Sequence, residues 1–210
     1  MADTAIRPQP RIEEAYEPSL FGTYSKKIGM WLFILSDSLT FGALLFAYSY
    51  GRISTPYWPT PFHTESIINA SVMTAFLLTS SLTMVLAVSA ASFGDRKKAI
   101  RWLLATMFCG AMFVVLHIHE WIGLIGQGML PNKNPWGPPQ FGGTFFTLTG
   151  LHMLHVTIGV LYLGVIALRT SSIKKFSAQD VEVSGLYWHF VDLVWMFIFP
   201  LVYLMSTKII

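Results

Sequence analysis

Charged residues are scarce in this chain, and cysteine is nearly absent. Only 12% of the 210 residues are charged, against roughly 25% in a soluble domain of average composition. This scarcity excludes an ordinary water-soluble globular protein, and the 53% of hydrophobic residues indicates a protein that crosses a membrane several times. The one cysteine, Cys109, lies in an apolar segment, which excludes an intrachain disulfide framework and predicts a buried, inert thiol.

A secretory signal is also lacking. Residues 1–27 hold basic, acidic and proline residues but no apolar core, so we expect a polar cytoplasmic arm there. Residues 28–210 have short connections and are expected to form one membrane domain. Five apolar segments reach the roughly 20 residues that one crossing needs, and helices satisfy the backbone inside lipid. We therefore predict an all-α polytopic membrane protein, a five-helix transmembrane bundle, with helices at about 28–50, 67–92, 99–125, 143–168 and 183–206.

Basic residues are divided unevenly between the two sides of such a bundle. The N-terminal arm and the second and fourth connections carry 11 lysines and arginines, whereas the other connections and the C-terminal end carry 3. The positive-inside rule then places the N-terminus in the cytoplasm and the C-terminus outside. Topology thus explains the net charge of +3, which gives no indication of nucleic-acid binding.

Seven of the acids and histidines inside the predicted helices are candidate site residues, because an unpaired polar group there is costly and a protein partner is expected. The helical rise of about 1.5 Å per residue sorts them by depth. It predicts an inner layer of Asp37, His189 and Asp192. It also predicts an outer layer of His117, Glu120 and His152, with His155 near the middle of the membrane. For Asp37, the partners closest in depth are His155 and His189.

Three interpretations of these residues compete. A metal or haem site is one, but His117 and His119 point to different sides of their helix, and only His152 and His155 have a chelating spacing. A proton path is the second, because intramembrane acids such as Asp37 and Glu120 are functional candidates by default. The third is structural: acid–histidine pairs join helix to helix, with small residues at close contacts.

Two long motifs occur in the last two helices. The last helix contains Tyr187-Trp-His-Phe-Val-Asp-Leu-Val-Trp195, and the preceding one has paired histidines within the stretch 143–159. An acid followed by an aromatic, Glu120-Trp121, precedes both. With these motifs in this order, residues 28–206 resemble subunit III of haem-copper respiratory oxidases, in the short five-helix bacterial form.

The resemblance implies an accessory role in a bacterial inner membrane. Family members bind no haem and no copper, which belong to subunits I and II, so no catalytic, cofactor or metal residue is expected in this chain. The implied partners are subunit I as the main contact, subunit II and bound phospholipid. The resemblance also favours His155 as the hydrogen-bonding partner of Asp37.

The chain departs from the family pattern in two ways. Mitochondrial-type members have seven helices, and the two that are lacking here help form a lipid-holding cleft. Ser36-Asp37 stands where the family usually has glutamate, as in quinol-oxidase-type versions, and the shorter side chain requires a closer partner. The function implied is a non-catalytic subunit of a proton-pumping terminal oxidase. An accessory subunit of a nitric-oxide-reductase-type complex is the alternative, and an independent enzyme or transporter is the third possibility.

Overall fold

The computed structural model describes residues 25–59, 61–62, 64–172 and 176–206, and it is built from helices. The five long helices are α1 (Ser25–Ser54), α2 (Thr64–Ser92), α3 (Arg96–Gly126), α4 (Pro139–Ser171) and α5 (Ala178–Ile198). Each is long and apolar enough to cross a membrane, α5 together with the turns that follow it. The predicted all-α bundle of five spans is therefore confirmed, and the chain is an integral membrane protein.

Every helix begins earlier than its apolar segment, because backbone hydrogen bonding continues into the polar flanks. The expected polar arm falls mostly on residues 1–24, outside the described residues, while its last three residues, 25–27, are already part of α1. Local caps set two of the other starts. The side chains of Asp95 and Ser177 accept hydrogen bonds from backbone N–H groups at the starts of α3 and α5.

The last span is not the single continuous helix that the sequence predicts. Regular α5 ends at Ile198, and a π-helical turn, Phe199–Tyr203, and a 3₁₀ turn, Leu204–Ser206, follow it. Pro200 lies at the start of the π-helical turn and has no N–H to donate to the carbonyl four residues earlier. The wider turn changes the direction of the side chains within it and after it, among them Tyr203.

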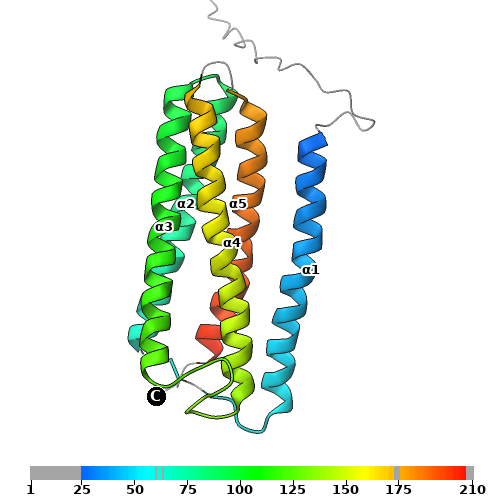
Figure 1. Ribbon diagram of the computed structural model, residues 1–210, viewed down its shortest axis with the longest axis vertical. Coiled ribbons are helices and arrows are strands. Elements are labelled where there is room, and N and C mark those ends of the chain that lie inside the picture. Colours follow the sequence, from blue (N-terminus) through cyan, green and yellow to red (C-terminus); the bar gives the residue numbers. More distant parts are fainter. Residues whose placement is uncertain (1–24, 60, 63, 173–175, 207–210) are drawn as a thin grey trace, which may run out of the picture.

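Four helices form the bundle, and α1 lies against one edge of it. Figure 1 shows α2, α3, α4 and α5 grouped together, with α1 beside them. Helix α1 contacts α4 and α5 along a narrow stripe, and of its side chains only Phe41 and Tyr48 are fully buried. Its other face exposes large apolar residues such as Leu35, Leu39 and Phe46, as expected for a surface in contact with lipid or another chain.

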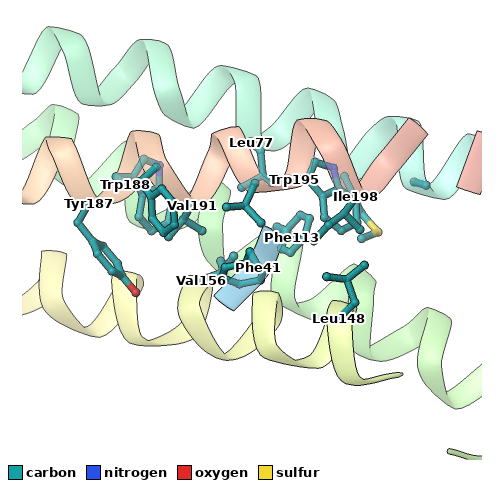
Figure 2. Close-up of a cluster of buried hydrophobic side chains, with 14 of the residues drawn as sticks. Phe41, Leu77, Phe113, Leu148, Val156, Tyr187, Trp188, Val191, Trp195 and Ile198 are labelled. Atoms are coloured by element: carbon teal, nitrogen blue, oxygen red, sulfur yellow. The ribbon is translucent and has the colours of Figure 1, made fainter. Parts of the chain in front are cut away.

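Helix α5 anchors the core through its tryptophans. Trp188 is fully buried, and its indole N–H donates to the Ser80 hydroxyl at 2.9 Å. Its ring lies where two glycines allow close approach: a Cβ atom on Gly110 or Gly159 would lie 2.5 or 2.9 Å from ring carbons of Trp188. Figure 2 shows side chains from all five helices meeting along this line, including Phe41, Leu77, Phe113, Val156 and Trp195. Such glycine-mediated contact is typical of membrane bundles.

The turn between α2 and α3 shows how few residues reverse the chain. Gly94 has a positive φ of 75°, and the N–H groups of Gly94 and Asp95 donate to Ala91 and Ala90 in the pattern that ends a helix at glycine. Asp95 then accepts from the Lys98 N–H at the start of α3. This hydrogen bond holds the pKa of the Asp95 carboxyl below its ordinary value.

Both ends of α1 contact the last membrane span. At its start, Lys26 and Lys27 lie 3.0 and 2.6 Å from carboxylate oxygens of Asp180 and Glu182. At the other end, the Tyr48 hydroxyl lies 2.8 Å from that of Ser206, and Arg52 donates to the carbonyl of Met205. The lysine pairs are partly exposed, so each contributes roughly 0–1 kcal/mol.

Candidate functional site

Asp37 on α1 lies against His155 on α4, the partner that the resemblance favours, but the two do not form the expected hydrogen bond. The distance between Asp37 Oδ2 and His155 Nε2 is 3.3 Å, and each side chain is 13% exposed. Phe41, one turn after Asp37, packs edge-on to the His155 ring at a centroid distance of 5.3 Å. Asp37 therefore faces the bundle, although its helix is the least buried.

Hydrogen bonds of His155 fix the orientation of its side chain and backbone. His155 Nδ1 lies 2.8 Å from the Leu151 carbonyl oxygen, which can only accept, so Nδ1 carries a hydrogen. In a neutral imidazole, Nε2 is then the acceptor, and contact with a bare carboxylate would leave no hydrogen between them. Asp37 Oδ2 has no hydrogen-bond partner among the described residues, so its 3.3 Å approach to Nε2 is a close polar contact between α1 and α4. The Tyr187 hydroxyl donates to the His155 carbonyl at 2.9 Å and joins α5 to the same place.

The predicted outer layer gathers around Trp195. His117 and His152 are fully buried, and their ring centroids lie 5.7 and 5.2 Å from the Trp195 ring. Phe113 packs edge-on against His152 and Trp195. No hydrogen-bond partner for the four imidazole nitrogens occurs among the residues that the structure describes.

Glu120 lies near this group and is joined to the end of the chain. Its Oε2 atom accepts a hydrogen bond of 2.9 Å from the buried hydroxyl of Tyr203, in the π-helical turn. The other carboxyl oxygen has no partner within the described part of the chain. Glu120 thus connects α3 to the segment after α5.

The predicted inner layer does not form one group. Asp37 contacts α4, whereas His189 on α5 uses Nδ1 to contact the Ser81 hydroxyl on α2 at 2.8 Å. Asp192 is buried next to Ser81, and neither of its carboxyl oxygens is hydrogen-bonded to a described residue. Similar depth predicts one layer, but the side chains point in different directions around their helices, so Asp37 lies apart from His189 and Asp192.

Sequence reasoning missed the hydroxyl partners. Ser81 lies within the run Thr79-Ser80-Ser81, whose small size indicated only close packing, and Tyr203 gave no signal because its direction depends on the π-helical turn. A hydroxyl inside a membrane segment, at a depth similar to that of an acid or histidine, is the signal in the sequence that indicates Ser81 as a partner. Among the described residues, no three histidines, cysteines or acids lie together in a way that could hold a metal ion.

Comparison with known proteins identifies the family. Residues 19–207 match the family model of cytochrome c oxidase subunit III. The chain is 34% identical to the cytochrome bo(3) ubiquinol oxidase subunit 3 of Pseudomonas aeruginosa, over 85% of this chain and 84% of that protein.

Relatives named for cytochrome c and relatives named for quinol are similar to the chain at the same level. Identity is 33% to the cytochrome c oxidase subunit 3 of Alkalihalophilus pseudofirmus, over 87% of this chain and 88% of the relative. It is 32% to the quinol oxidase subunit 3 of Bacillus spizizenii, over 85% and 86%. The chain therefore belongs to the cytochrome c oxidase subunit III family.

Proposed function

We propose that the chain is the non-catalytic subunit III of a proton-pumping haem-copper terminal oxidase, which reduces O2 to water with electrons from cytochrome c or quinol. In this proposal the haems and copper belong to other subunits. The chain packs on subunit I and stabilises it, holds phospholipid at the contact, and supports proton uptake.

The observation that carries the proposal is the Asp37–His155 contact. It joins the least buried helix to the bundle. The contacts of Glu120 with Tyr203 and of His189 with Ser81 also join separate elements of the chain. These polar groups support a structural role, and the carboxyl of Asp37, with one buried oxygen that has no hydrogen-bond partner among the described residues, supports a role beside a proton-uptake path.

Replacing Asp37 tests this role. We expect Asp37→Ala to weaken the bundle or its hold on subunit I by about 0.6–2 kcal/mol, the usual range for hydrogen bonds inside membranes. O2 reduction should continue at first, with slowed proton uptake or a shorter active lifetime. Oxygen consumption over time and the subunit content of the purified complex measure both effects.

The Asp37→Asn form provides the decisive comparison. An assembled but immediately inactive Asp37→Asn complex would mean that Asp37 is an obligatory proton carrier. If both variants match wild type in assembly, rate and lifetime, Asp37 has neither role.

The proposed topology places the N-terminus in the cytoplasm and the C-terminus outside. The start of α1, the α2–α3 turn, the end of α4 and the start of α5 lie at one end of the bundle, and the ends of α1 and α3 at the other (Figure 1). Basic residues at the starts of α1 and α3 and the end of α4 are therefore on one side. We expect cysteines placed at Ser25 and Thr207 to be labelled from opposite sides of the membrane; labelling of both from one side would contradict the topology.

A further inference from the structure

Two fully buried histidines lie close together inside the bundle. His117 on α3 and His152 on α4 are near enough to interact electrostatically, and neither side chain has any exposed surface. They share two aromatic neighbours. The Phe113 ring centroid lies 5.5 Å from that of His117 and 5.6 Å from that of His152, and Trp195 is in contact with both imidazoles and with Phe113 (Figure 2). The two imidazoles thus lie in one enclosed aromatic surrounding.

The hydrogen-bonding groups of these histidines are unsatisfied within the chain. A neutral imidazole carries one N–H donor and one bare nitrogen that accepts. All four ring nitrogens are buried, and none has a partner among the residues that the structure describes. Buried polar groups in native proteins nearly always have a hydrogen-bond partner, so a cluster of unsatisfied ones indicates a bound water molecule or ion.

Complete burial limits what can reach the two rings. A lipid headgroup or a side chain of another protein would have to open the bundle to contact them, so the partner is small and enclosed. A metal ion does not fit, because no three histidines, cysteines or acids in the described part of the chain lie together in a way that could hold one. Water fits the chemistry, since one molecule accepts from an N–H and donates to a bare nitrogen at the same time.

We propose that an internal water molecule is bound between His117 and His152. It accepts a hydrogen bond from the N–H of one imidazole and donates one to the bare nitrogen of the other, which joins α3 to α4 beside Trp195 of α5. Every residue of this site belongs to the chain itself. The inference therefore goes beyond the proposed function and does not depend on the partner subunits.

A density map of the assembled complex, at a resolution that shows ordered water, tests the site directly. We expect one peak that lies about 2.7–3.2 Å from a nitrogen of each imidazole. A direct hydrogen bond between the two rings, or no peak between them, would overturn the proposal. So would stoichiometric metal in the purified chain that is lost when both histidines are replaced.

A pair of substitutions tests whether the two imidazoles share a partner. Leucine is similar to histidine in size but has no hydrogen-bonding group. We expect His117→Leu and His152→Leu each to raise the unfolding equilibrium constant of the purified chain in mixed micelles about tenfold, because each leaves the other imidazole and the water short of a partner. The double variant should lie within about threefold of wild type, because water and both polar rings are then replaced by apolar groups.

His119→Leu is the matched control, since His119 lies on the exposed surface of the same helix. It should change the unfolding equilibrium constant by no more than about twofold. A double variant that shows the product of the two single losses, about a hundredfold, would mean that the imidazoles share no partner and would overturn the proposal. If the single variants do not fold, the density map of the wild-type complex still decides.

Discussion

Trp188→Ala is expected to lower the free energy of unfolding by about 3 kcal/mol. Removing a large buried ring from a soluble core costs about 3–5 kcal/mol. The lower value applies here because lipid is as apolar as the protein interior, which leaves lost packing and the lost Ser80 hydrogen bond as the cost. The glycines that face the ring have no side chains with which to fill the space. Unfolding of the purified chain in mixed micelles measures the change.

Trp102→Ala is the matched control for this prediction. Trp102 is 36% exposed near the start of α3, so its removal should change the free energy of unfolding by no more than about 0.5 kcal/mol. Equal losses from the two variants would show that Trp188 is not the anchor that its burial implies.

Tyr203→Phe is expected to cost about 1–3 kcal/mol of stability. The phenylalanine ring can keep the contact with Phe62, whose ring centroid lies 4.8 Å from that of Tyr203. The hydroxyl that donates to Glu120 Oε2 is lost, however, and a buried carboxyl group then has no described partner at either oxygen. Leaving a buried acceptor unsatisfied costs its full desolvation penalty. The same micelle unfolding experiment measures it.

A double variant separates the hydrogen bond from packing. Replacing both partners by apolar groups can be nearly neutral, so Tyr203→Phe combined with Glu120→Leu should recover most of the loss. Tyr50→Phe, at an exposed tyrosine of α1, should have no effect. A loss from Tyr203→Phe that persists in the double variant would assign it to packing instead.

The sequence predicted the helices well because hydrophobic length is a local property. Five apolar segments of sufficient length allow little besides five helices, and the short connections allow one bundle. The break near Pro200 was missed because proline inside an apolar segment can be accommodated in several ways, and tertiary packing selects among them. The ends of helices depend on single capping residues such as Asp95 and Ser177, which an apolar pattern does not include.

The candidate site was only partly predictable, because partners depend on rotation around each helix as well as on depth. Depth placed Asp37 near both His155 and His189, and the family resemblance favoured His155. The structure agrees because α1 lies against α4 and α5, with Asp37 facing His155, while His189 points to Ser81 on α2. That direction follows from how the helices pack, which a sequence pattern does not specify.

Purification of the tagged chain from native membranes tests the central claim most directly. The account predicts co-purification with a haem- and copper-containing complex that consumes O2 with cytochrome c or quinol. After dissociation from that complex, the chain itself should carry no haem absorbance and no stoichiometric metal. Haem b with non-haem iron in the complex would instead identify a nitric-oxide-reductase-type assembly, and stoichiometric haem or copper on the isolated chain would contradict the account.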